Sequence, residues 1–124
     1  MQGTIERISQ IGINVRDIDR AIEFYKSNLG LELQFHTENM AFLECGEIRL
    51  LLSLPEKEEF DHKSSVLYFH VDDIKEAYQN MVENGVSFRG EPHAVAKMET
   101  TETWLVFFND TEGNTHALTS EIEG

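Results

Sequence analysis

The sequence predicts an α+β fold made of two tandem β-α-β-β-β units, and three observations support this prediction. Residues 11–30 resemble residues 67–85, so the chain contains an internal repeat. In each copy a segment of alternating apolar and polar residues, typical of a half-buried strand, leads into apolar residues at helical spacing. Each helical pattern stops at a glycine, Gly30 or Gly85. A repeat of this size indicates two copies of one supersecondary unit, with a cleft between them.

Identical residues carry the repeat at a constant offset. The first copy contains Val15, Asp17, Ile18, Ala21 and Asn28, which recur in the second as Val71, Asp73, Ile74, Ala77 and Asn84. Between the copies, residues 55–65 are charged and poor in apolar side chains, which is typical of a connecting segment. We therefore predict one domain, 1–124, with a first unit of residues 1–56 and a second unit of residues 64–124.

The first unit is expected to begin with a strand over Ile8–Val15, because apolar residues recur there at every second position. Asp17 is the predicted N-cap of a helix that runs to Asn28, and Gly30 supplies its left-handed C-terminal residue. A tight turn at Gly46-Glu47 joins the last two strands of the unit. The strands that follow the helix are predicted over Leu31–Thr37, Met40–Cys45 and Ile48–Leu54.

The second unit repeats this order. After a strand over Val66–Val71, Asp73 is the predicted N-cap of a helix that runs to Asn84. Its buried stripe is predicted to include Met81 and Val82. A turn at residues 110–114 precedes the closing strand. The strands after the helix are predicted over Val86–Arg89, Ala94–Met98, Thr103–Phe108 and Thr115–Ser120.

Composition narrows the classes of partner. The chain has 124 residues, 10 Lys and Arg against 23 Asp and Glu, and a formal net charge of -13. This charge repels phosphate backbones and anionic lipids, so we expect no nucleic-acid and no membrane partner. Cys45 is the only cysteine, and no apolar run has the length of a signal peptide or a membrane span. We expect a cytoplasmic protein.

Several short motifs stand in the same order as in a known superfamily. They are Asn14-Val-Arg-Asp17, Phe24-Tyr25 and Leu29-Gly-Leu31 in the first unit, with His70-Val-Asp-Asp73 and Asn109–Asn114 in the second. With the duplicated layout, they make the chain resemble the vicinal oxygen chelate superfamily of glyoxalase I, bleomycin-resistance proteins and extradiol dioxygenases. The segment Glu91–Met98, followed by Trp104–Asp110, resembles a metal-free glyoxalase-like subgroup of that superfamily. The resemblance implies a cup-shaped mixed and antiparallel sheet with the helices outside, a ligand in the cup, and commonly a homodimer.

The resemblance also implies which positions hold a metal ion in the enzymes of the superfamily. At those positions this chain has Gln10, Leu51, Val66 and Ala117. Hydrocarbon side chains offer no lone pair, and an amide oxygen is a poor ligand for zinc or iron. We therefore expect no metal ion and no cofactor.

The remaining candidates are ligand-binding residues. Phe42, Tyr68 and Trp104 are the aromatic residues expected to line the cup with Gln10, Leu51 and Ala117, although an aromatic residue in a strand is more often part of a core. Arg49 has the parity of Leu51 and suits a carboxylate or phosphate; the alternative is a cross-strand ion pair. His93 follows Glu91-Pro92 in a rim loop, where it contacts a ligand or braces the loop.

The other histidines and the cysteine have simpler interpretations. His62 falls in the connecting segment, where a solvated side chain is expected. His70 and His116 lie next to strand ends and are more often structural than metal-binding. His36 fits no metal signature with them. Cys45, beside a turn glycine, is expected to be a small buried residue and not a nucleophile.

Three functions remain open. The first is a protein of bleomycin-resistance type that binds a small organic molecule in a metal-free cup. The second is a lyase, isomerase or dioxygenase of the glyoxalase type with an atypical or absent metal site, including a metal-free enzyme that uses His93 and Glu44 as acid and base. The third is a dimeric interaction module without a small-molecule ligand.

Overall fold

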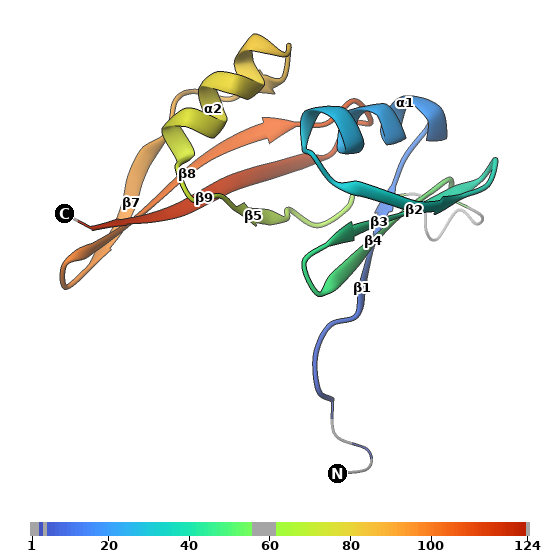
Figure 1. Ribbon diagram of the computed structural model, residues 1–124, viewed down its shortest axis with the longest axis horizontal. Coiled ribbons are helices and arrows are strands. Elements are labelled where there is room, and N and C mark those ends of the chain that lie inside the picture. The colour runs from blue at the N-terminus through green and yellow to red at the C-terminus, as the bar shows by residue number, and fades with distance from the viewer. Residues whose placement is uncertain (1–2, 4, 56–61, 124) are drawn as a thin grey trace. The chain divides into compact units, whose positions relative to one another are not determined.

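The computed structural model describes residues 3, 5–55 and 62–123 (Figure 1). The chain divides into two compact units, residues 1–62 and 63–124, each with its own sheet and its own helical segment. No helix among these residues has the length and apolar character needed to cross a membrane.

The sheet of the first unit has four strands in the order β1-β4-β3-β2. β1 lies parallel to β4, and the other pairs are antiparallel, so the sheet is mixed. The helical segment follows β1 in sequence and packs against β3 and β4. The elements are β1 (Gln10–Asn14), α1 (Ile18–Glu23), the π-helix η1 (Phe24–Asn28), β2 (Glu32–His36), β3 (Met40–Cys45) and β4 (Ile48–Ser53).

The predicted first helix is present, but its second half is a π-helix. It begins where expected, because the side chain of Asp17 accepts a hydrogen bond from the backbone N–H of Arg20 at 3.0 Å. From Phe24 the helix widens, and the N–H of Leu29 bonds the carbonyl of Phe24, five residues back. The wider turn buries Phe24 as well as its neighbour Tyr25. Gly30 follows with a φ of 74°, the predicted left-handed conformation.

Alternation along the strands gives the first sheet two different faces. Ile13, Leu43, Leu50 and Leu52 are almost fully buried on the face that α1 covers. The intervening side chains point to the face opposite to α1, which we call the open face of the first sheet.

The sheet of the second unit has five strands, with the order β5-β9-β8-β6 and with β7 also paired to β8. β5 lies parallel to β9, as β1 does to β4. β6 pairs with the end of β8 and β7 with its beginning, so both lie along one edge of β8. The elements are β5 (Tyr68–His70), α2 (Ile74–Glu83), β6 (Ser87–Phe88), β7 (His93–Met98), β8 (Thr101–Asn109) and β9 (Thr115–Glu123).

The break between β6 and β7 explains why the second unit has one strand more than the first. Gly90, with a φ of 100°, and Pro92 interrupt the edge strand. β6 and β7 together therefore correspond to β2 of the first unit. The predicted β-α-β-β-β order and the α+β class are confirmed, with this interruption as the difference between the units.

The second helix begins and ends as predicted. The side chain of Asp73 accepts a hydrogen bond from the N–H of Glu76 at 3.1 Å, and Gly85 has a φ of 87°. Ile74 and Met81 are buried, but Val82 is 41% exposed, so the predicted stripe was one residue too wide. The cup formed by both units remains a prediction, and residues 56–61 of the predicted connecting segment lie outside the described residues.

Candidate functional site

The structure brings four of the predicted ligand-binding residues together on the open face of the first sheet. Gln10 of β1 lies opposite Arg49 of β4, and Leu51 lies opposite Phe42 of β3. All four alternate with the buried residues of the helix-covered face. Phe42 and Leu51 are half-buried, whereas Gln10 and Arg49 are exposed. The face therefore combines an apolar patch with polar side chains beside it.

Contacts among these residues fix the direction of the arginine. The Nε of Arg49 donates a hydrogen bond to the Oε1 of Gln10 at 3.2 Å. Its guanidinium carbon lies 4.3 Å from the centroid of the Phe42 ring, a cation–π contact. Phe35 of β2, which is 54% exposed, stacks on Phe42 with the ring centroids 6.2 Å apart. Arg49 is thus held against an aromatic surface.

A polar hollow of about 350 Å³ lies beside Arg49. The amide nitrogen of Gln34 donates a hydrogen bond to the Oε2 of Glu44 at 3.1 Å within it. Arg7 donates from its Nη1 to the backbone carbonyl of Glu47 at 3.3 Å. The full lining consists of Arg7, Ser9, Gln34, Glu44, Gly46, Glu47, Ile48 and Arg49.

Sequence reasoning did not single out Phe35, Gln34 or Arg7 as site residues. A β-bulge between Leu33 and Phe35 shifts the register of β2, so simple alternation does not assign the faces of this strand. Arg7 precedes the first strand and carries no motif. Its contact with Glu47 spans 40 residues of sequence, and only the parallel pairing of β1 and β4 makes it possible.

In the second unit, Tyr68 and His93 lie on the face of the sheet opposite to α2. Tyr68 is 57% exposed and its ring lies edge-on to Phe107, with centroids 6.2 Å apart. His93 lies opposite Leu105, and its Nδ1 is 2.9 Å from the carbonyl oxygen of Glu91. The contact with Glu91 joins residues only two positions apart, so it suits a role for His93 in bracing the loop before β7.

Ala117 lies opposite both Tyr68 and Phe107 in the register of the sheet. Its side chain is fully buried, so it offers no surface to a ligand. Ala117 lies in the closing strand, but its expected exposure in a pocket is wrong.

The expectation that Trp104 shares a face with Tyr68 is also wrong. In β8, Trp104 has the parity of Val106 and Phe108, which are fully buried on the side of α2. The Nζ of Lys75, a residue of α2, lies 4.9 Å from the centroid of the indole ring. Trp104 and Tyr68 thus point to opposite faces of the sheet and cannot stack on one ligand.

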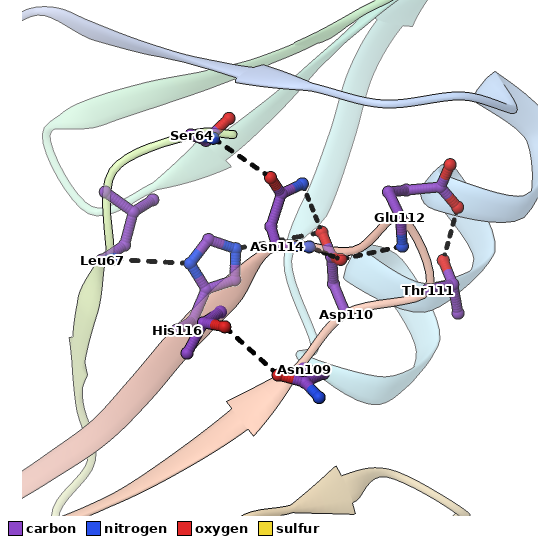
Figure 2. A network of polar contacts seen from close by, with 9 residues as sticks. Ser64, Leu67, Asn109, Asp110, Thr111, Glu112, Asn114 and His116 are labelled. Carbon is purple, nitrogen blue, oxygen red and sulfur yellow. Dashed lines mark hydrogen bonds and ion pairs between the residues drawn. The ribbon is translucent and has the colours of Figure 1, made fainter. Parts of the chain in front are cut away.

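A buried polar network fixes the turn between β8 and β9 (Figure 2). The Oδ1 of Asp110 accepts hydrogen bonds from the N–H groups of Glu112 and Asn114, both at 2.8 Å. The Oδ1 of Asn114 accepts one from the N–H of Ser64 at 3.3 Å, and the Nδ1 of His116 accepts one from the N–H of Leu67 at 3.4 Å. The network ties the segment that precedes β5 to the closing turn.

His116 has a structural role in this network, as its place beside a strand end suggested. It is fully buried, and burial lowers its pKa below the ordinary value, whereas the carboxylate of Asp110 acts in the opposite direction. Its Nε2 lies 4.0 Å from the Oδ2 of Asp110. Because Nδ1 accepts a backbone hydrogen bond, the neutral ring fits the site.

The residues present do not fit a metal ion. In the parts of the chain that the structure describes, no three His, Cys, Asp or Glu side chains gather closely enough to hold one. Gln10 bonds Arg49, and Leu51 and Ala117 are hydrocarbons at the positions that the resemblance assigns to ligands. Burial raises the pKa of the Cys45 thiol, which opposes a role as thiolate ligand or nucleophile.

A second hollow, of about 590 Å³, lies beside the start of α1. Its charged residues include Arg16, Asp17, Asp19 and Glu38, and His36 also lines it. Asp17 is already used as the N-cap of α1. No predicted ligand-binding residue lines this hollow, so we do not assign the site to it.

Comparison with known proteins shows similarity to one superfamily. Residues 7–118 match the sequence model of the Glyoxalase/Bleomycin resistance protein/Dioxygenase superfamily. The uncharacterized protein YraH of Bacillus subtilis (strain 168) is 31% identical over 101 residues, which cover 70% of this chain and 79% of that protein.

Solved structures show the same fold. A member of the superfamily from Sphaerobacter thermophilus DSM 20745 has a TM-score of 0.80 at 24% identity, covering 94% of this chain and 98% of that chain. A lactoylglutathione lyase from Agrobacterium tumefaciens has a TM-score of 0.74 at 19% identity, covering 94% of each chain.

Proposed function

This chain belongs to the Glyoxalase/Bleomycin resistance protein/Dioxygenase superfamily, and from that premise we propose that it binds a small organic molecule without a metal ion. The binding surface in this proposal is the open face of the first sheet. Phe42 and Leu51 form its apolar floor, and Gln10 and Arg49 form its polar side. The ligand is held by burial of apolar surface and by directional hydrogen bonds.

The observation that carries the proposal is the partial burial of the Phe42 ring and its contacts. Its ring is half-buried between Phe35 and the guanidinium of Arg49, and it lies on the face of the sheet opposite to α1. Covering such a surface stabilises a complex by roughly 25 cal/mol per Å² of apolar area. A flat organic molecule therefore gains free energy by stacking there, and Arg49 beside it selects its orientation.

The metal-free part of the proposal rests on the side chains at the positions that the resemblance assigns to metal ligands. Three of the four positions that the resemblance assigns to metal ligands carry hydrocarbon side chains, and the fourth, Gln10, orients Arg49. Purified protein should hold well below one equivalent of zinc, nickel, manganese or iron after incubation with each and desalting, measured by elemental analysis. One tightly held ion per chain would contradict this part.

The alternative function is catalysis of a lyase, isomerase or dioxygenase reaction. It is supported only by membership of the superfamily and by the shared fold with a lactoylglutathione lyase. In a metal-free reaction, His93 and Glu44 would act as acid and base. Glu44 accepts a hydrogen bond from Gln34, and His93 contacts the carbonyl of Glu91 in the loop before β7, so both have structural partners.

The proposal extends to the assembly and the compartment. We expect a cytoplasmic homodimer made of chains with two units, 1–56 and 64–124. The single cysteine suits a reducing compartment. β7 is an edge strand whose six residues are all exposed, which leaves a strand edge for pairing. Light scattering on a purified sample should give twice the chain mass at micromolar concentration, and the mass of a monomer would contradict the dimer.

A ligand screen tests the central part. Compounds from a metabolite and antibiotic library that bind only the folded protein raise its melting temperature. Hits should also shift backbone amide signals of β1, β3 and β4 in NMR spectra. A Phe42→Ala variant should lose these hits, whereas Lys26→Gln, on the exposed side of η1, should keep them. Hits that perturb only the second unit would contradict the proposed site.

A further inference from the structure

Beyond the binding of an organic molecule, the hollow next to the open face points to the chemistry of that molecule. We infer that the ligand carries an oxyanion, a carboxylate or a phosphate, which binds between Arg7 and Arg49. The inference rests on the proposed function, because the rest of the ligand lies on Phe42 and Leu51.

The first step concerns Arg49. Glu44 lies directly opposite Arg49 in the register of β3 and β4, so a cross-strand ion pair is the simplest expectation. Within the described residues no such pair forms. Glu44 accepts a hydrogen bond from Gln34. Arg49 donates a hydrogen bond from its Nε to Gln10, and the plane of its guanidinium packs on the ring of Phe42. Its two terminal nitrogens make no hydrogen bond to the described residues and are the groups that grip an oxyanion with two parallel bonds.

The second step concerns Arg7. One of its terminal nitrogens is anchored on the backbone carbonyl of Glu47, at the turn between β3 and β4. Arg7 lines the same hollow as Arg49, together with Ser9, whose carbonyl accepts the backbone N–H of Arg49 at 3.0 Å. Two arginine residues therefore line one hollow of about 350 Å³ in a chain whose net charge is -13.

The third step concerns the carboxylates in the same lining. Glu44 and Glu47 balance the two arginines in formal charge, so the hollow has no net positive charge to attract a free anion. An inorganic ion gains little there. A molecule with an apolar ring gains the burial on Phe42 in addition, and its oxyanion is placed at the arginines by that contact.

Paired probes test this inference: 2-naphthoate, 2-naphthyl phosphate and the uncharged 2-naphthamide, each titrated into the ¹⁵N-labelled chain, with acetate and inorganic phosphate as ring-free controls. We expect naphthoate or naphthyl phosphate to shift amides of β1, β3 and β4, and to bind at least about tenfold more tightly than naphthamide. Which of the two binds more tightly identifies the oxyanion. Acetate and inorganic phosphate should cause no comparable shifts.

Substitutions test whether Arg7, Arg49 and Glu44 determine the affinity for the charged probes. Arg49→Gln and Arg7→Gln should each weaken binding of the charged probe by a larger factor than binding of naphthamide, because only the charged probe loses an ion pair. Glu44→Gln should strengthen it, because it removes a repelling charge and keeps an acceptor for Gln34. Lys26→Gln removes a positive charge elsewhere in the unit and should have no effect. Unchanged amide spectra of the free variants show that they fold.

The outcomes separate this inference from the proposed function. If naphthamide binds the open face as tightly as the charged probes, the oxyanion site is wrong and the organic-ligand site stands. If the charged probes bind but the arginine variants bind them equally well, the assignment to Arg7 and Arg49 is wrong. If no probe with a ring shifts the open face, the proposed site fails, and the oxyanion site fails with it.

Discussion

Arg49 is the residue on which the candidate site depends, and its position follows from two neighbours. Phe42 supports the plane of the guanidinium, and Gln10 accepts a hydrogen bond from its Nε. Where the superfamily resemblance implies a metal ligand, Gln10 instead orients a cation. In the proposed site, Gln10 therefore orients an anion-binding guanidinium instead of coordinating a metal ion.

The role of Gln10 gives a prediction at this scale. Gln10→Ala should weaken binding of an oxyanion ligand by about three- to tenfold, because the lost hydrogen bond is worth about 0.5–1.5 kcal/mol. Gln10 is exposed, so the melting temperature of the free protein should stay nearly the same. Calorimetric titration of wild type and variant with 2-naphthoate measures the effect. Gln10→Glu, which keeps an acceptor, should restore the orientation of Arg49, and equal affinity in wild type and Gln10→Ala would contradict the positioning role.

At the scale of the elements, sequence patterns predict most of the fold. Asp17 and Asp73 mark the starts of both helices, and Gly30 and Gly85 follow their ends with positive φ, because these residues act through local geometry. β3 has the predicted bounds, Met40–Cys45. Local signals need no knowledge of the partners of each strand.

The failures concern residues whose environment depends on those partners. The aromatic character of Trp104 predicts a place in the cup, but its parity with Val106 and Phe108 in β8 places it towards α2. Parity could have given this result from the sequence alone, had the buried residues of the strand been chosen first. The π-helix and the bulge in β2 could not be predicted, because no local sequence rule marks where one residue is added to a helix turn or strand.

The N-cap of α2 can be tested by substitution. Asp73→Ala removes the acceptor for the N–H of Glu76 and should lower the free energy of unfolding by about 1 kcal/mol. The matched control is Glu83→Ala at the exposed end of the same helix, with an expected change within about 0.5 kcal/mol. Urea denaturation followed by circular dichroism measures both. Equal changes in the free energy of unfolding of the two variants would contradict a stabilising role of Asp73 as N-cap.

His116 makes the stability of the closing turn depend on pH. Its pKa is lowered by burial in the folded chain, so the unfolded chain binds a proton more readily. The contribution of His116 to the free energy of unfolding is therefore constant above the ordinary histidine value of 6.5 and falls as the pH drops below it towards the lower folded value. Loss of the Nδ1 acceptor for Leu67 accompanies protonation.

The variant His116→Gln separates this effect from the other titrating groups. Between pH 7.5 and 5, wild type should lose more stability than the variant, with an extra slope of at most about 1.4 kcal/mol per pH unit. The variant is expected to be less stable at every pH, so the comparison uses the difference in slope. Denaturation at several pH values provides it, and identical slopes would show that folding does not lower the pKa of His116.

At the scale of the whole molecule, duplication gives the two units the same layout but different surfaces. Both sheets are mixed, with a parallel pair between the first and last strand of each unit. The open face of the first sheet carries the oriented Arg49, whereas in the second unit Ala117 is buried and a polar network fixes the closing turn. The first unit therefore carries the residues of the proposed binding site. Among the described residues, the second unit carries the buried polar network at the turn between β8 and β9.

The most direct test of the proposed function is a calorimetric titration of the best organic ligand from the screen, in buffer that contains a metal chelator. The account predicts that wild type binds with unchanged affinity in the chelator and that Phe42→Ala loses at least about tenfold in affinity, because an aromatic contact of this kind and its buried area are worth more than 1.4 kcal/mol. Binding that disappears with the chelator, or that survives intact in Phe42→Ala, would contradict a metal-free site on the open face of the first sheet.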